Sequence, residues 1–453
     1  MKRWMWVALA AMVVVAGGVS LIAVPKSPEW TSSSPEAVAE FQAGMDAAMK
    51  VYLQDAQRYY RRAVELDPDF VIANLFAIDG YHGDEERRAA MWSVVENADL
   101  SQLTPRERFF VETARARHDK RFEDAERLLD EYLADYPNDP YILHQKALRT
   151  WGRGDLDEAE RLNLRLVEIS PNWVIAYNQL GYINMMKGRF AEAEEYFKSY
   201  RFIAPDQANP YDSLGELFIT LGRYAEARES LDKAIEVKPD FWAAYEHLAI
   251  MAGCGGDIAL LEETLERLRA AGGPEPVVVG VECLKDYSEL RSAGAWEEIV
   301  DRADSTCVEG FREGFSAVTT HLAASKLGNW EVAEAMEAEA QRMLEKVEKA
   351  PDKRSSTAIR GILRHMEGVR LALQGDLEGA EAKLREADES LTYMETGIAV
   401  FKLQNRLALS EVLLAGGQDA DAHALLSKVR SVNPVLVAEF EDAGLKELGL
   451  KRM

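Results

Sequence analysis

A repeat of 34 residues is the feature that most constrains the fold of this 453-residue chain. A proline and a glycine each recur four times at this spacing, and an alanine and a large apolar residue recur in phase with them. The two punctuating series are Pro137, Pro171, Pro205 and Pro239, and Gly154, Gly188, Gly222 and Gly256. Coincident series of this period are typical of repeat arrays. We therefore expect one array of similar units, and not the roughly three independent domains that the length alone suggests.

Each period has the pattern of a helical hairpin. In residues 208–241, Leu214 and Phe218 lie four residues apart and share one face of a first helix. Gly222 follows as a turn, because glycine adopts a positive φ without strain. The small Gly215 on the same face lets the second helix approach closely. The repeat thus predicts pairs of antiparallel helices.

These hairpins resemble the tetratricopeptide repeat. Residues 174–207 carry its pattern of large, small and turn residues at Tyr177, Leu180, Gly181, Gly188, Ala193, Phe197 and Pro205. The resemblance is strongest over 106–241, covers an array over 37–275, and continues as divergent hairpins over 276–453. Further hairpins are expected at 280–313, 314–347, 361–394 and 403–436, with a capping helix from Val437 to Met453. The resemblance implies an all-α solenoid of stacked antiparallel helix pairs. The stretch around Thr104 is similar to arrays of bacterial signalling proteins.

The N-terminus has the pattern of a membrane anchor. An apolar run without charge extends from Trp4 to Val24, after Lys2 and Arg3. A helix of this length spans about 30 Å, the thickness of a bilayer core. The basic residues precede the run, so the sequence predicts a single-pass inner-membrane helix at 1–24 with the remainder in the periplasm. Residues 25–36 are rich in Pro and Ser and are expected to form a linker.

Cleavage of a signal peptide is the alternative for this segment. Gly18, Val19 and Ser20 are small enough to form a cleavage site, although the apolar run continues beyond them. Cleavage would leave a periplasmic protein without an anchor.

Charge restricts the expected partners. The chain has 77 acidic against 53 basic residues, a formal net charge of −24. Such an excess opposes binding to nucleic-acid phosphates and to anionic lipid headgroups. We therefore expect no nucleic-acid partner and membrane contact only through the N-terminal helix. The sequence does not give the oligomeric state.

The resemblance implies a binding groove lined by the first helix of each hairpin. Carried over to this sequence, the groove-lining positions are Phe110, Tyr141, His144, Trp151, Asn178, Tyr182, Met185, Met186, Asp212, Glu216 and Glu246. Aromatic and Met side chains adjoin an acidic stretch, which favours a protein or peptide partner with apolar anchors and basic residues. The alternative is that the aromatic residues fill a tightly wound superhelix. The family's clamp of Lys, Asn and Arg for a terminal carboxylate is not transferred, because these positions lack the lysines.

Two cysteines occupy facing positions of the expected hairpin at 280–313. Cys283 and Cys307 could form a disulfide in an oxidising compartment, or remain two small buried thiols. Cys254 has no evident mate.

No catalytic, phosphate-binding or metal-binding motif is found, and the seven histidines do not cluster along the sequence. We therefore expect no cofactor, no metal and no enzymatic activity. The sequence favours a membrane-tethered scaffold that binds a partner segment in its groove. A self-assembling structural subunit, or an enzyme with a site in residues 276–400, are the alternatives.

Overall fold

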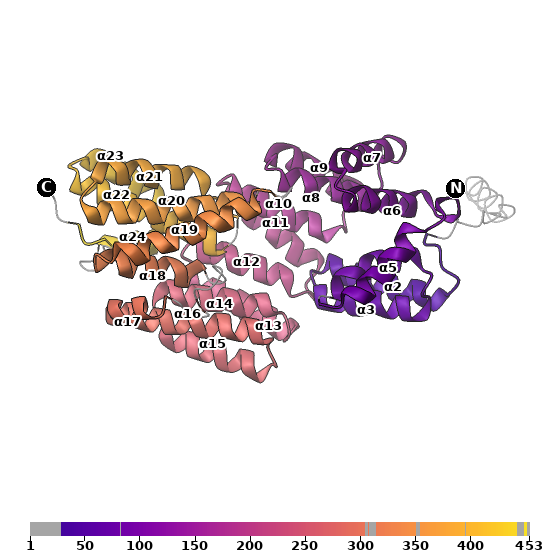
Figure 1. Ribbon diagram of the computed structural model, residues 1–453, viewed down its shortest axis with the longest axis horizontal. Helices are drawn as coiled ribbons and strands as arrows, with labels where there is room; N and C mark the ends of the chain where they lie inside the picture. Colours follow the sequence, from indigo (N-terminus) through magenta and orange to yellow (C-terminus); the bar gives the residue numbers. More distant parts are fainter. Residues whose placement is uncertain are drawn as a thin grey trace, which may run out of the picture. The chain divides into compact units, whose positions relative to one another are not determined.

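The computed structural model describes residues 29–450, except for 82, 304–306, 308–313, 350–353, 395 and 442–447. Among these residues every regular element is a helix, which confirms the all-α prediction (Figure 1). None of the described helices combines the length and the apolar character that a membrane span needs. The predicted anchor at 1–24 lies outside the described residues, so it stays a prediction.

The chain divides into two compact units. Unit 1 comprises residues up to 48 together with 53–132, and unit 2 comprises 49–52 together with 133–453. The predicted division at 275/276 therefore marks a loss of repeat regularity inside unit 2. The helices that begin in unit 1 are α2 (Pro35–Met49), α3 (Leu53–Leu66), α4 (Val71–Ala77), α5 (Glu85–Glu96), α6 (Pro105–His118) and α7 (Phe122–Asp135), with 3-10 turns η1 (Ile78–Gly80) and η2 (Leu100–Gln102).

Unit 2 consists of eight helix pairs and a terminal helix among its described residues. The repeats of regular spacing form α8 (Pro140–Gly152), α9 (Leu156–Ile169), α10 (Val174–Met186), α11 (Phe190–Ile203), α12 (Asn209–Thr220), α13 (Tyr224–Val237), α14 (Trp242–Gly255) and α15 (Ile258–Ala270). The divergent part forms α16 (Glu275–Ala293), α17 (Trp296–Asp301), α18 (Gly314–Lys326), α19 (Trp330–Val347), α20 (Arg354–Gln374), α21 (Leu377–Ser390), α22 (Thr396–Ala415), α23 (Asp419–Val432) and α24 (Pro434–Glu441).

Glycine performs the two tasks that the sequence predicts for it. Gly222 has φ +71° in the turn between α12 and α13, and the glycines at its 34-residue spacing also have positive φ. Gly215 lies against the next helix, where an added Cβ would stand 2.6 Å from Leu231 Cγ. Because this distance is far below van der Waals contact, only glycine permits the observed approach of α12 and α13.

Of the predicted capping helix over Val437 to Met453, residues 442–447 and 451–453 lie outside the described residues. The last helix, α24, begins three residues earlier and ends at Glu441. The backbone N–H groups of Leu448 and Leu450, which are not helical, donate to the buried carboxylate of Glu411. This end is thus fixed by hydrogen bonds to one side chain of α22.

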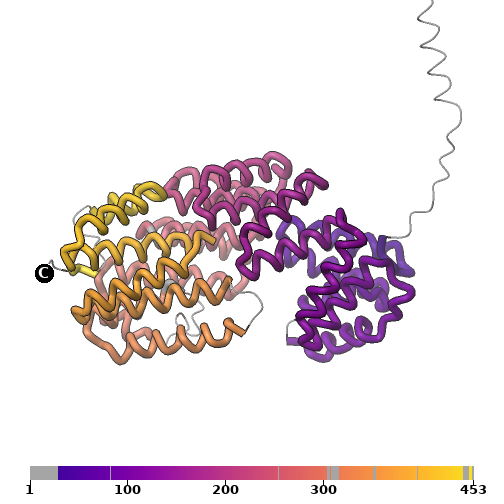
Figure 2. The backbone as a smooth tube through the Cα atoms, turned by 90° about the horizontal axis from the view of Figure 1, so that it is seen from above, coloured from indigo at the N-terminus to yellow at the C-terminus, as the bar shows by residue number. Residues whose placement is uncertain are grey.

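The first helices of six consecutive pairs form a closed circuit within unit 2. Each of α12, α14, α16, α18, α20 and α22 contacts the next, and α22 also returns to contact α12 and α14. Figure 2 shows the C-terminal helices, in orange and yellow, running alongside the magenta helices of the regular repeats. The face that an open array of this kind would present as a groove is therefore covered at α12 by the chain itself.

Burial of α12 follows from this closure. Every residue from Asp212 to Thr220 is buried, although an inner helix of an open array would leave one face in solvent. The side chains of Val400 and Leu403 on α22 belong to the same apolar cluster as Leu217 and Ile219. At the C-terminal end of α12, Asn433 Nδ2 donates to Thr220 O at 3.2 Å.

Candidate functional site

Polar side chains of successive first helices form a ladder through unit 2. Asn178 of α10 donates to Ser213 Oγ of α12 at 2.8 Å, and Tyr182 Oη donates to Glu216 Oε1 at 3.0 Å. Gln179 Nε2 of α10 lies 3.5 Å from His144 Nδ1 of α8. Each contact joins residues 34 or 35 positions apart, so the ladder follows directly from the repeat.

The ladder ends in a buried cluster, which we call the His247 cluster: Asp212, Glu216 and His247. Asp212 and Glu216 lie one turn apart on α12, and His247 projects from α14. His247 Nδ1 lies 2.8 Å from Asp212 Oδ1, and Nε2 lies 3.2 Å from Glu216 Oε1. The imidazole is thus held between two carboxylates that are only 3% and 5% exposed.

His247 supplies the positive charge in this cluster. Burial by itself would lower the pKa of His247, but the carboxylates of Asp212 and Glu216 outweigh burial and raise that pKa to about 10. Burial raises the pKa of Glu216, and the positive His247 counteracts this shift. At neutral pH the imidazole is therefore a cation that donates from both nitrogens.

This arrangement disfavours proton transfer and metal binding. The three residues have the ligand types and the spacing that could hold a divalent cation. However, a metal would need one imidazole nitrogen as an electron-pair donor, and here both nitrogens donate protons to carboxylates. A cation would have to displace the proton that Asp212 and Glu216 help to hold on His247. We therefore interpret the His247 cluster as an ion-paired contact that joins α12 to α14.

Helix α22 covers the His247 cluster. Thr396 at its start is 1% exposed, and its hydroxyl lies close enough to Glu216 to lower the pKa of that carboxyl. Neither Thr396 Oγ1 nor Glu216 Oε2 has a well-aligned hydrogen-bond partner. Helix α22 therefore lies close to the ladder, but these two polar atoms do not form well-aligned hydrogen bonds across the contact.

The predicted groove residues fall into two groups by exposure. The buried ones are His144, Trp151, Asn178, Met185, Asp212 and Glu216, and those that still reach solvent are Phe110, Tyr141, Tyr182, Met186 and Glu246. In the structure, Asp212 and Glu216 both pair with His247. The sequence suggested instead that these carboxylates would pair with a basic residue of a partner. Glu246 remains exposed, although desolvation by neighbouring atoms raises its pKa.

Trp151 is covered by two side chains of the same unit. Its indole Nε1 donates to Met186 Sδ at 3.2 Å, and the Arg354 guanidinium lies 4.9 Å from its ring centroid. Tyr182 stacks beside it with ring centroids 6.5 Å apart. These aromatic residues therefore contribute to packing, the alternative that the sequence left open. Tyr182, Met186 and Arg354 keep partial exposure, whereas Trp151 is buried.

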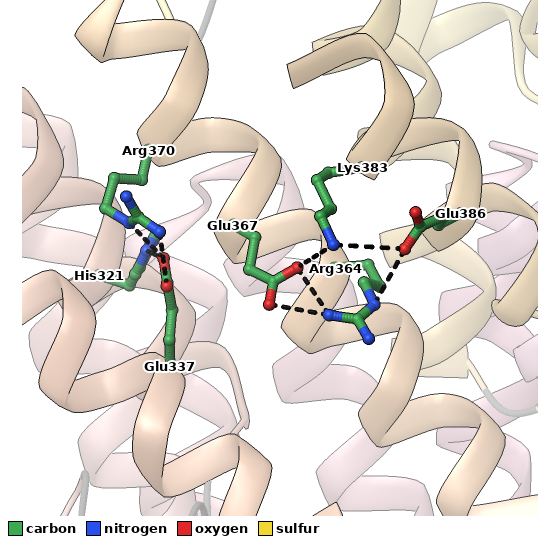
Figure 3. Close-up of polar contacts among 7 residues, drawn as sticks. All are labelled: His321, Glu337, Arg364, Glu367, Arg370, Lys383 and Glu386. Atoms are coloured by element: carbon green, nitrogen blue, oxygen red, sulfur yellow. Dashed lines mark hydrogen bonds and ion pairs between the residues drawn. The ribbon is translucent and has the colours of Figure 1, made fainter. Parts of the chain in front are cut away.

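A second polar cluster lies in the divergent helices (Figure 3). Arg370 binds both oxygens of Glu337, at 2.8 and 3.0 Å, and His321 Nε2 lies 3.0 Å from the same carboxylate. Burial lowers the pKa of His321, and Glu337 only partly restores it. Beside it, Arg364 Nη1 donates to both oxygens of Glu367 on the same helix. Lys383 and Glu386 of α21 pair with Glu367 and Arg364 respectively. These ion pairs join α18, α19, α20 and α21 and satisfy one another, so we assign them a structural role.

Cys283 and Cys307 form a disulfide in the structure, with Cα atoms 5.6 Å apart. It joins α16 to a residue beyond the end of α17, where the described helix is only six residues long. Among the described pairs this second helix is the shortest. The bridge therefore links α16 covalently to the segment that follows α17.

Sequence reasoning missed the residues that the closure brings in. No site role was assigned to His247 from the sequence, although it stands 35 positions after Asp212, one full period plus one. That offset was a usable signal, because side chains one period apart meet on neighbouring first helices. Arg354, Thr396 and Asn433 had no such signal, since their partners lie in distant repeats.

Comparisons with known proteins agree with the repeat. Models of the tetratricopeptide repeat match residues 208–241 and residues 144–208. No curated protein matches the chain. Among solved structures, the chain is similar to one in the APC/C hetero-tetramer Cut9–Hcn1, at 14% identity, TM-score 0.46, and coverage of 90% of this chain and 76% of that one. It is also similar to one in Naa15/Naa10 bound to HypK-THB, at 15% identity, TM-score 0.28, and coverage of 75% and 66%. The chain therefore contains tetratricopeptide repeats between residues 144 and 241.

Proposed function

We propose that this protein is a non-catalytic scaffold that binds a segment of another protein on the first helices α8 and α10. The observation that carries the proposal is the difference in exposure along the repeat. At α12 the first-helix face is closed by α22, whereas Tyr141, Leu148, Tyr182 and Met186 on α8 and α10 still reach solvent. A preformed face of apolar side chains binds with little ordering cost.

The partner in this proposal is an extended or helical segment with apolar side chains. Aromatic and Met side chains supply adaptable apolar contacts. Glu246 on α14 remains exposed nearby along the series of first helices, which favours a basic residue on the partner. The proposal drops a basic partner for Asp212 and Glu216, because both carboxylates are buried and pair with His247.

We also propose that the protein is anchored by residues 1–24 in the inner membrane of a bacterium, with the array in the periplasm. The charge-free run from Trp4 to Val24 after Lys2 and Arg3 supports an anchor. The disulfide between Cys283 and Cys307 supports an oxidising compartment. Cleavage of the segment remains the alternative outcome.

A crosslinking pull-down from membranes tests the binding face. We expect the double variant Leu148→Ser/Met186→Ser to lose, at least about tenfold, a partner that the wild-type protein captures. The matched control is Leu164→Ser/Phe202→Ser, which changes apolar side chains that are 45% and 86% exposed on the second helices α9 and α11. Equal capture by wild type and the α8/α10 variant, with capture lost in the control, would move the site to the second helices.

Two simple measurements test the anchor and the compartment. Alkaline carbonate extraction should leave the chain in the membrane fraction, with an intact N-terminal Met1 by mass spectrometry. Non-reducing alkylation in cells should modify neither Cys283 nor Cys307. A soluble chain that lacks its first residues would establish cleavage instead.

A further inference from the structure

The residues that follow the apolar N-terminal segment are folded onto unit 1. Residues Glu29–Ser34, which we call the strap, belong to the linker that the sequence predicts at 25–36. Trp30 of the strap is 3% exposed and packs edge-on against Phe41 of α2 with ring centroids 4.9 Å apart. It also stacks with Phe110 of α6 at 6.5 Å. This part of the predicted linker is therefore no free tether.

Two buried or partly buried carboxylates hold the strap by hydrogen bonds. Thr31 donates its backbone N–H and its hydroxyl to Glu107, at 2.6 and 2.7 Å, and Glu107 is fully buried. Ser32 Oγ donates to Asp67 Oδ2 at 2.5 Å, and the Ser33 N–H donates to the same oxygen at 3.1 Å. Burial would raise the pKa of Asp67, but these hydrogen bonds outweigh it and lower that pKa. Hydrogen bonds to charged acceptors are among the stronger ones in proteins.

An ion pair fixes the first residue of the strap. Glu29 Oε1 accepts from Arg106 Nη1 at 2.8 Å, at the N-terminal end of α6. The Arg106 guanidinium also lies 5.7 Å from the Trp30 ring centroid. Each strap residue from Glu29 to Ser33 thus has its own contact with unit 1.

The strap shortens the free segment between the predicted membrane helix and the folded protein. Only Pro25–Pro28 separate the apolar run from Glu29. Five Cα–Cα steps from Val24 reach at most roughly 18 Å, whereas a free linker to residue 36 would reach roughly 40 Å. We propose that the strap holds the α6 end of unit 1 against the lipid surface, so that the array starts at the membrane. This inference rests on the proposed anchor at residues 1–24.

Energy transfer to lipid headgroups measures this distance in the full-length chain. A donor dye is placed at Arg108→Cys, an exposed position in the first turn of α6, in a Cys254→Ser background. The acceptor is a dye on the headgroups of nanodisc lipids. Insertion of twelve Gly/Ser residues between Pro28 and Glu29 leaves the strap intact and lengthens the free segment that precedes it. We expect transfer efficiency to fall by about a third or more on insertion.

A second pair of variants tests the strap itself. Thr31→Val with Glu107→Gln removes the hydroxyl hydrogen bond and the negative charge of the acceptor. This weakens the strap and should also lower the transfer, whereas Glu112→Gln on the same helix should not. Circular dichroism confirms that each variant is folded. Unchanged transfer in both the insertion and the strap variants, with the chain retained in the disc, would overturn the inference alone. Chain that does not stay in the disc would overturn the proposed anchor, and this inference with it.

Discussion

The first helices α8 and α12 have the same place in repeats two periods apart, yet their surroundings are opposite. His144 on α8 and Asp212 on α12 occupy the same repeat position, 68 residues apart. His144 is buried without a charged partner, and burial lowers its pKa to about 4. Asp212 is buried against His247, whose pKa its carboxylate helps to raise to about 10. One repeat position therefore holds a neutral imidazole in α8 and an ion pair in α12.

Closure of the circuit explains this difference. Helix α22 packs on α12, so charges on α12 lose water and need a partner inside the protein. On α8, Tyr141 and Leu148 keep partial contact with solvent. The comparison teaches that in this chain the repeat fixes where a side chain points, while its neighbour from a distant repeat fixes what chemistry it can have.

Breaking the ion pair on the closed side should have the largest effect. His247→Ala would leave Asp212 and Glu216 buried without a counter-charge, which costs about 3–5 kcal/mol of the free energy of unfolding. Thermal denaturation of unit 2 measures it. His423→Ala, at an exposed position of α23, is the control and should change the melting temperature little. An equal, small shift in both would mean that the His247 cluster is hydrated.

Apolar truncations compare the two faces directly. Ile219→Ala on α12 removes a fully buried side chain and should cost about 2–5 kcal/mol. Leu148→Ala on α8 removes a partly exposed side chain and should cost about 1 kcal/mol, because less apolar area leaves water there. Urea denaturation of both variants gives the difference. Equal costs would contradict the closure of α12 by α22.

The two histidines should give opposite pH dependences. The folded pKa of His144 lies below its ordinary value of 6.5, so stability should fall as the pH drops from 6.5 toward 4. The folded pKa of His247 lies above 6.5, so its stabilisation is complete below 6.5 and is lost as the pH rises toward 10. Each histidine changes the free energy of unfolding by roughly 3 kcal/mol or more across its full pH range. Melting curves against pH should lose the acid slope in His144→Gln and the alkaline slope in His247→Gln, and a slope unchanged by its own variant would refute the assignment.

A smaller effect is expected at the edge of the closure. Asn433→Ala removes the donor to Thr220 O and the acceptor for Leu436 N–H, at a cost of about 1–2 kcal/mol. Ser431→Ala, two residues earlier and exposed, is the control. Hydrogen exchange of the last turn of α12 should accelerate in the first variant only. Exchange unchanged in both would show that Asn433 does not hold this end.

The regular hairpins could be predicted residue by residue. Gly222 and Gly215 have the turn and close-packing roles assigned from their spacing, because both depend on neighbours within the same 34-residue unit. The divergent hairpin expected at 314–347 appears as α18 with α19, with the same outer bounds. The hairpin expected at 403–436 appears as α22 with α23, which run from Thr396 to Val432. The binding prediction for Trp151 and Tyr182 remains untested, although the structure assigns Trp151 contacts with Met186 and Arg354.

The sequence by itself determined the repeat, the helix pairs and the ladder of contacts one period apart. Such contacts are local in a solenoid, since each unit packs mainly on its neighbours. Only the tertiary structure decided that α22 returns to α12, where Asn433 and Thr220 meet although 213 residues separate them. This closure depends on small rotations that add up over six first helices, and no residue pattern within one unit records their sum. The buried state of Asp212 and Glu216 follows from that closure.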